Sequence, residues 1–221
     1  ANLSGGLKAK TQATALVSLS LILALYFHYK LGYDLIHVPA VGDFSIGWLY
    51  IPLFITVVFS TTKAVSITDG LDGLAGGLLS LAFGSFAVIS FFSGLPMLAG
   101  FCATLVGALL AYTWFNIFPA RFFMGQVGST ALGAVLGVIA MLTNSVFVLP
   151  IIGIVFVMEA GSSFIQVFSK KVFKRKVFLS APLHHHLEAI GWPETKVTMR
   201  LWVIGAIMGT FGLIIGLIAR G

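Results

Sequence analysis

Charged residues are scarce in this sequence of 221 residues: 9% are Asp, Glu, Lys or Arg, whereas 58% are hydrophobic. A water-soluble domain usually has about 25% charged residues, so this composition excludes that class and indicates a membrane protein. The 13 basic and seven acidic side chains give a formal net charge of +6. Because no basic stripe lies in a soluble domain, we interpret this excess as an orientation signal and a contact for membrane lipid, and we expect no nucleic acid as a partner.

Cysteine is nearly absent as well. Cys102 is the only one, and it lies within an apolar run. A single cysteine excludes an internal disulfide and a metal site built from several cysteines. The first residues contain neither an initiator Met nor a signal peptide, so we expect the sequence to be a processed or shortened part of a longer one.

Long apolar runs fill most of the sequence. A helix needs about 20 apolar residues to cross the bilayer core, and this length predicts one all-α domain, a polytopic transmembrane bundle. We expect seven spans, at residues 11–29, 44–62, 74–93, 97–118, 130–143, 146–168 and 201–219. Small residues such as Gly133 and Gly137 should allow these helices to pack closely.

The basic residues are unevenly divided between the two sides of this bundle. If the N-terminus is cytoplasmic, all of them except Lys30 and Arg220 lie on the cytoplasmic side. Short loops rich in Lys and Arg are retained in the cytoplasm, which supports this orientation. The same side holds three polar loops, at residues 63–73, 116–129 and 169–200. Their polar side chains favour an enzyme whose substrate comes from the cytoplasm.

Two carboxylates three residues apart, Asp69 and Asp72, lie in the sequence Thr-Asp-Gly-Leu-Asp-Gly just before an apolar helix. Such a pair could hold Mg²⁺ with its phosphates, activate a nucleophile or accept hydrogen bonds from a sugar. The structural alternative is that these residues cap the helix that follows.

Three consecutive histidines, His184, His185 and His186, follow an Ala-Pro pair. Imidazoles can bind phosphate, transfer protons near neutral pH or ligate a metal. Three successive helical residues cannot all face one ion, so we favour contact with phosphate or substrate over a zinc site. The structural alternative is a polar loop tip.

Aromatic residues, Asn116 and a glycine-rich turn occur together at residues 114–129. A nucleotide base can stack on an aromatic ring while an amide contacts its edge, whereas the structural alternative is an aromatic belt at the membrane interface. Glu159 lies inside the sixth expected span. It is either a buried, hydrogen-bonded helix contact or a part of the polar cavity, and we favour the structural contact. The basic cluster at residues 170–176 is interpreted as a topology anchor that can also attract anionic lipid head groups.

Three motifs together carry a family resemblance: Thr-Asp-Gly-Leu-Asp-Gly-Leu at 68–74, Phe-Met-Gly-Gln-Val-Gly-Ser at 123–129, and Ala-Pro-Leu-His-His-His at 181–186. In this order, and followed by Gly-Trp-Pro-Glu, they resemble the MraY family. These are the phospho-N-acetylmuramoyl-pentapeptide transferases of the polyprenyl-phosphate N-acetylhexosamine-1-phosphate transferase superfamily. The resemblance implies an enzyme of the bacterial inner membrane. It would transfer phospho-MurNAc-pentapeptide from UDP-MurNAc-pentapeptide to undecaprenyl phosphate with Mg²⁺, giving lipid I and UMP. A second copy of the chain is a candidate partner.

The resemblance also implies roles for individual residues. The residues that match the family's catalytic positions are Asp69, Asp72, His184, His185 and His186. Those that match substrate-binding positions are Gly70, Leu71, Asn116 and Phe123, together with Lys63 and Ser66, where the family has Asn. The metal would be held at Gln126, where the family has Asp, and by Asp69.

Two departures from the family pattern affect the expected activity. The family has ten spans and an Asp-Asp pair before the fourth, so we expect these seven spans to be its last seven. An amide oxygen from Gln126 is a weaker Mg²⁺ ligand than a carboxylate, so we expect the chain as given to be incomplete or impaired. The alternative function is a non-catalytic scaffold or binding protein that keeps the fold. A transporter is less favoured, because most carboxylates are expected at helix ends rather than at the bilayer midplane.

Overall fold

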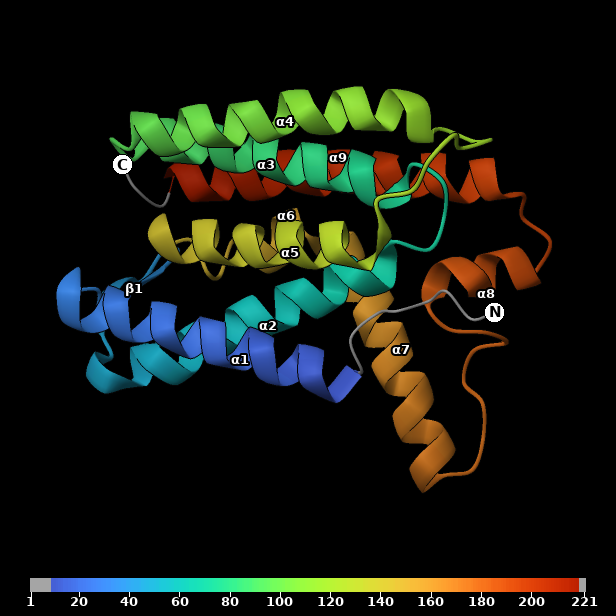
Figure 1. Ribbon diagram of the computed structural model, residues 1–221, viewed down its shortest axis with the longest axis horizontal. Coiled ribbons are helices and arrows are strands. Elements are labelled where there is room, and N and C mark those ends of the chain that lie inside the picture. Colours follow the sequence, from blue (N-terminus) through green and yellow to red (C-terminus); the bar gives the residue numbers. More distant parts are fainter. Residues whose placement is uncertain (1–8, 219–221) are drawn as a thin grey trace.

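The structure, a computed structural model, describes residues 9–218 and is almost entirely helical (Figure 1). Six long helices form the bundle: α1 (Ala9–Leu25), α2 (Tyr50–Thr68), α3 (Leu74–Phe92), α4 (Pro96–Asn116), α5 (Gly125–Leu142) and α9 (Glu194–Ile218). Judged by length and composition, each belongs to a segment that can cross a membrane. The predicted all-α polytopic fold is therefore confirmed.

Helix α3 lies at the centre of the bundle. In its most apolar stretch 67% of the residues are buried, compared with 22% in that of α4. It packs against α4 and α9, while α2 packs against α1 and α5. The main apolar core contains Phe83 and Phe86 of α3 together with Leu136 and Ile139 of α5. The central position of α3 fixes the acidic turn that precedes it relative to the other helices.

Glycines on α5 allow that helix to approach α2 very closely. A Cβ atom added at Gly133 would lie 2.7 Å from the Cα atom of Thr62, and one at Gly137 would lie 3.0 Å from the Cα atom of Val58. The close packing expected at these glycines is therefore confirmed. The result is that the C-terminal end of α2 and the N-terminal end of α5 lie side by side.

The sixth expected span, 146–168, is where the structure differs most from the expectation. Its residues form α6 (Leu149–Ile152) and α7 (Ile154–Val172), which are separated at Gly153. Helix α7 turns away from the bundle, at the lower right of Figure 1, and α8 (Leu183–Ala189) leads the chain back. A Pro in the first turn of α6 suits the start of a new helix there, and the break after α6 falls at Gly153, which has a low helix propensity.

The element boundaries also differ from the expected spans and loops. Helix α2 continues to Thr68, so Lys63 and Ser66 are helical rather than in a loop. The connection before the second expected span forms an antiparallel hairpin of β1 (Leu35–Val38) and β2 (Gly42–Ser45). The first residues of that span complete β2 and form a 3₁₀ turn, η2 (Gly47–Leu49), before α2 begins. A π-helical turn, η1 (Tyr26–Lys30), ends the first helical segment. Among these differences, α2 shows that backbone hydrogen bonding can continue a helix beyond its apolar run.

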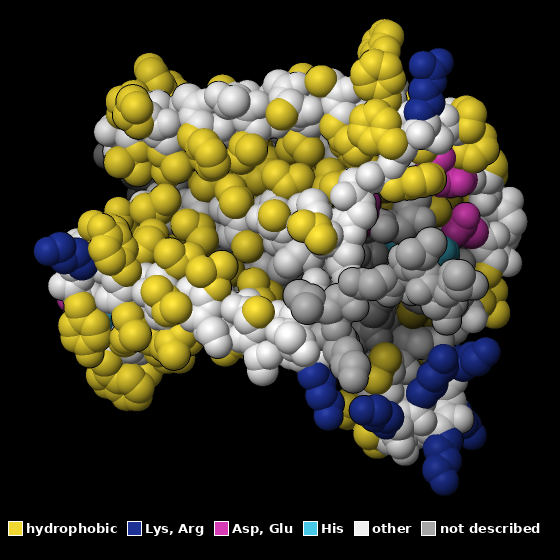
Figure 2. All heavy atoms as spheres, viewed as in Figure 1, with side chains coloured by type: hydrophobic (Ala, Val, Ile, Leu, Met, Phe, Trp, Pro, Cys, Tyr) yellow, Lys and Arg dark blue, Asp and Glu magenta, His cyan; other side chains and the backbone are white. Residues whose placement is uncertain are grey.

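The polar connections gather at one end of the bundle. The turn between α2 and α3, the α4–α5 loop and the segment from α7 to α9 lie at the right of Figure 1, whereas the hairpin lies at the left. Figure 2 shows hydrophobic side chains along the sides and most Lys and Arg side chains at the lower right. The polar side chains expected to act together therefore lie at the same end.

Candidate functional site

The acidic turn connects α2 to α3 without capping α3. Helix α3 begins after Gly73, which has a φ of 73° and no side-chain capping bond. This left-handed conformation suits glycine, and the Gly73 N–H donates a hydrogen bond of 3.0 Å to Asn116 Oδ1. The capping interpretation therefore does not explain either carboxylate of this turn.

Asp72 is held from three sides. Its backbone N–H donates to Glu194 Oε1 over 2.7 Å, and its Oδ2 atom accepts a hydrogen bond of 2.9 Å from the Ala120 N–H. The Thr198 hydroxyl donates to its carbonyl oxygen over 3.3 Å. Asp72 thereby links the turn to the α4–α5 loop and to α9, which makes it a structural anchor of the site.

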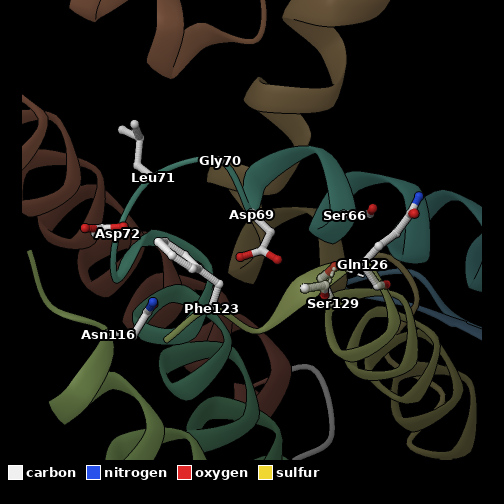
Figure 3. Close-up of a pocket in the computed structure, with 10 residues that line it drawn as sticks. Ser66, Asp69, Gly70, Leu71, Asp72, Asn116, Phe123, Gln126 and Ser129 are labelled. Carbon is white, nitrogen blue, oxygen red and sulfur yellow. Dashed lines mark hydrogen bonds between the residues drawn. The ribbon is translucent and has the colours of Figure 1, made fainter. Parts of the chain in front are cut away.

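Asp69 is bound less tightly and points toward Ser129 (Figure 3). Burial raises the pKa of the Asp69 carboxyl above 3.8, and a hydrogen bond with the Ser129 side chain partly opposes that shift. In Figure 3, Asp72 lies on the other side of the Phe123 ring. Of the two carboxylates in this turn, Asp69 is thus the more available to a ligand.

A polar cavity of about 340 Å³ opens beside this turn (Figure 3). Its walls come from the end of α2, the acidic turn, the end of α4 and the start of α5. The lining residues are Ser66, Asp69, Gly70, Leu71, Asp72, Asn116, Phe123, Gly125, Gln126 and Ser129. The structure thus brings together most residues that the sequence proposed for substrate binding.

Asn116 and Phe123 contribute different properties to the cavity. Asn116 is buried, and its amide joins two loops: Oδ1 accepts from Gly73, and Nδ2 donates to the Phe122 carbonyl over 2.8 Å. Phe123 is 72% exposed, so its ring is available for stacking. Asn116 therefore stabilises the cavity wall, and Phe123 offers an aromatic surface to a ligand.

Gln126 takes part in a chain of neutral hydrogen bonds at the rim of the cavity. Its Nε2 atom donates to Gln12 Oε1 over 3.1 Å. Gln12 Nε2 in turn donates to Thr130 Oγ1 over 3.2 Å. We call these three residues the amide bridge; they connect α1 to the first turns of α5.

His184 supports the acidic turn from outside the cavity. It is 1% exposed, and its Nδ1 atom lies 2.8 Å from Oε2 of the fully buried Glu159. The backbone N–H of His184 also donates a hydrogen bond of 3.2 Å to Glu159 Oε1. A Cβ atom added at Gly70 would lie 2.5 Å from His184 Nε2, so the ring packs directly against the turn.

The other two histidines have local partners. His185 Nδ1 lies 2.7 Å from Glu188 Oε2. His186 Nδ1 accepts a hydrogen bond of 3.3 Å from the Leu179 N–H. None of the three histidines is among the residues that line the cavity described above. Their proposed catalytic role stays a prediction.

The sequence placed Lys63 at the site, predicted Glu159 as a buried structural contact, and did not connect Gln12 with the site. Lys63 does not line the cavity, and its Nζ atom lies 5.9 Å from the Phe59 ring centroid. Glu159 carried one signal, because a carboxylate within an apolar helix needs a buried partner. Gln12 carried no such signal, since an amide near a helix start is common on polar surfaces.

The cavity offers Mg²⁺ few charged ligands. In the part of the chain that the structure describes, no group of three His, Cys, Asp or Glu residues could hold a metal ion. Mg²⁺ usually takes one or two protein carboxylates and completes its shell with water and substrate phosphates. Asp69, with neutral oxygens from Gln126 and Ser129 nearby, fits a metal that brings further ligands with a phosphate.

Fold and cavity together define a multi-pass membrane protein with a polar ligand site at one end of its helix bundle. A family model described as glycosyl transferase family 4 matches residues 3–144. The chain belongs to glycosyl transferase family 4.

Curated relatives agree with the resemblance drawn from the motifs. The chain is similar to the phospho-N-acetylmuramoyl-pentapeptide-transferase of Chloroflexus aurantiacus, with 44% identity over 89% of this chain and 56% of the relative. The enzymes of that name from Desulfotalea psychrophila and Shouchella clausii are 38% and 42% identical, over 95% and 89% of this chain and 64% and 62% of the relatives. The chain thus spans roughly 60% of the length of these relatives, and the MraY resemblance is confirmed.

Proposed function

We propose that the chain forms the cytoplasmic-facing substrate site of a phosphoglycosyl transferase in the bacterial inner membrane. The donor would be UDP-MurNAc-pentapeptide and the acceptor undecaprenyl phosphate, with lipid I and UMP as products. The observation that carries this proposal is the single cavity in which Asp69, Asn116 and Phe123 meet from three separate segments. The names of the relatives support the same substrate class.

The proposed reaction exchanges one phosphorus–oxygen bond for another. An oxygen of the acceptor phosphate bonds to the phosphorus next to the sugar, and the bond between the two phosphates of the donor breaks, which releases UMP. In such phosphoryl transfers the protein contributes mainly by positioning and by stabilising charge. We assign uracil stacking to Phe123 and acceptance of a proton from the acceptor phosphate to Asp69, whose raised pKa suits proton transfer.

An apolar groove suits the acceptor's polyprenyl chain. It has a volume of about 450 Å³ and is lined by residues of α2, α5, α6 and α7, among them Val65, Leu136 and Phe156. Val65 is adjacent in sequence to Ser66, which lines the polar cavity, so the groove and the cavity share one helix. We propose that the lipid tail occupies this groove while its phosphate reaches the polar cavity.

Mg²⁺ is the proposed cofactor, and its place is beside Asp69 and Gln126. Bound there, a divalent cation would neutralise charge on the transferred phosphate. Ser129 hydrogen-bonds to the Asp69 carboxylate, and the amide bridge holds the Gln126 side chain at the cavity rim. These contacts orient the two side chains before a ligand arrives.

A direct test measures lipid I formation in membranes supplied with UDP-MurNAc-pentapeptide, undecaprenyl phosphate and Mg²⁺. We expect little product from the chain as printed, because Gln126 is neutral, and more from a Gln126→Asp variant of the full-length protein that contains it. Adding Asp69→Asn to that variant should lower the amount of product by about 10²- to 10⁴-fold. If the full-length Gln126→Asp protein makes no lipid I, the proposed reaction is wrong.

A binding protein that keeps this fold is the second candidate, and the neutral Gln126 favours it. It predicts that UDP binds to the cavity while neither the chain nor its Gln126→Asp variant forms product. Binding by calorimetry and turnover on the same samples separate the two candidates.

A further inference from the structure

We infer that this chain binds a divalent cation only together with the diphosphate of a nucleotide ligand, because Gln126 is neutral and Asp72 is engaged by the Ala120 N–H, which leaves Asp69 as the carboxylate of the cavity that a metal can use. The inference rests on the proposed function and specifies how its site assembles.

The first observation is the small number of charged ligands. Asp69 and Asp72 are the acidic residues that line the cavity. One Asp72 oxygen already accepts the Ala120 N–H, and Asp72 lies across the Phe123 ring from Asp69 (Figure 3). A metal ion beside Asp69 would thus gain one carboxylate from the described residues. This is the lower limit of what Mg²⁺ usually takes from a protein, so most of its ligands must come from elsewhere.

The second observation is the hydrogen bonding of Gln126. Its amide nitrogen is turned toward Gln12, and Gln12 in turn donates to Thr130. In Figure 3 the Gln126 amide points away from Asp69. The amide oxygen is a neutral ligand, and so is the hydroxyl of Ser129. Neither adds negative charge that would attract a free cation.

The third observation concerns the ligand's own charge. No Lys or Arg is among the residues that line the cavity in the described part of the chain. A diphosphate placed beside Asp69 would therefore meet negative charge with no basic side chain to offset it. A divalent cation between the diphosphate and Asp69 removes this repulsion, and the phosphates complete the metal's oxygen shell. Each ligand therefore raises the affinity for the other, by the same factor.

The test uses the purified full chain, with UDP as the nucleotide and Mn²⁺ as a spectroscopic substitute for Mg²⁺. Electron paramagnetic resonance reports bound Mn²⁺, and calorimetry reports bound UDP. We expect no saturable Mn²⁺ binding without UDP, and UDP affinity that rises about tenfold or more when Mg²⁺ replaces EDTA. The UDP-dependent increase in Mn²⁺ affinity should match that factor.

Variants of Gln126 make the inference specific. Gln126→Asp should create Mn²⁺ binding without UDP and reduce the coupling, because it adds a second carboxylate near Asp69. The matched neutral variant Gln126→Asn should behave as the wild-type chain does. Gln12→Ala breaks the bridge without adding charge and should also leave Mn²⁺ unbound in the absence of UDP.

Each outcome has a distinct meaning. Saturable Mn²⁺ binding to the wild-type chain alone, or UDP affinity that is equal in EDTA and Mg²⁺, would overturn the inference and leave the proposed function standing. Failure of UDP to bind under any condition, with thermal unfolding still cooperative, would overturn the proposed function and the inference with it.

Discussion

Asp69 and Asp72 lie three residues apart in one turn, yet the two residues make different contacts. Asp72 joins three segments through hydrogen bonds, whereas Asp69 meets the Ser129 hydroxyl and the open cavity. In the full-length Gln126→Asp protein, we therefore expect Asp69→Asn to lower turnover by about 10²- to 10⁴-fold, the usual contribution of a proton-transfer group, with little loss of thermal stability. Asp72→Ala should lower both turnover and thermal stability. Equal losses of stability would contradict this division of roles.

The environment of Asp69 also predicts how stability depends on pH. Burial raises the pKa of this carboxyl in the folded state above 3.8, so folding favours the protonated form. That stabilisation is fully present below the unfolded-state pKa and is lost as pH rises through the folded-state pKa. Without ligand, the stability of wild type relative to Asp69→Asn should thus fall as pH rises above 3.8. Thermal unfolding in detergent at a series of pH values measures the difference, and parallel curves would refute it.

Glu159 and His184 form the other pair whose replacement is informative. Glu159→Ala leaves two buried N–H groups of His184 without an acceptor, which should cost about 1–3 kcal/mol for each group. Glu159→Gln keeps an acceptor and should recover part of that stability. Because the His184 ring packs against Gly70, Glu159→Ala should also weaken UDP binding.

Gly70→Ala provides an independent check of the same contact. Its added methyl group would overlap the His184 ring, so UDP affinity should fall although Glu159 is intact. Unchanged UDP affinity in both Glu159→Ala and Gly70→Ala would show that His184 does not position the turn.

At the scale of helices, the contact between α2 and α5 frames the cavity. Gly133→Ala places a methyl group 2.7 Å from the Thr62 Cα atom, and overpacking of this kind costs about 1–3 kcal/mol. Gly107→Ala on α4 is the matched control, because no atom lies within 4 Å of the added methyl group there. We expect a lower melting temperature and weaker UDP binding for Gly133→Ala only. Equal melting temperatures for the two variants would contradict the packing argument.

The long helices and the close packing at glycines could be predicted, because apolar length and small residues are local properties of the sequence. The break at Gly153 was harder to predict, since its neighbours form a continuous apolar run. The hairpin was missed for a similar reason: its short strands pair only locally, and the aromatic residues that follow extend the apolar pattern.

At the scale of the whole molecule, contacts between distant segments limited what the sequence could reveal. Gln12 and Gln126 are 114 residues apart, and Glu159 and His184 are 25 apart. Which polar side chains meet depends on how helices pack, and no local pattern encodes it. The residues of the acidic turn and aromatic loop could be proposed because their motifs resemble a family, and the structure places most of them around one cavity.

The uneven distribution of basic residues predicts which side of the membrane this cavity faces. Lys174 follows the end of α7, whereas Val41 lies in the hairpin at the other end of the bundle, and both are exposed (Figure 1). Cys102 is fully buried, so a membrane-impermeant maleimide should report cysteines introduced at these two positions. In intact spheroplasts we expect labelling of Val41→Cys but not of Lys174→Cys, and labelling of both after the membrane is opened. The opposite pattern would place the cavity outside, away from a cytoplasmic UDP-linked donor, and would remove the basis for the proposed transfer.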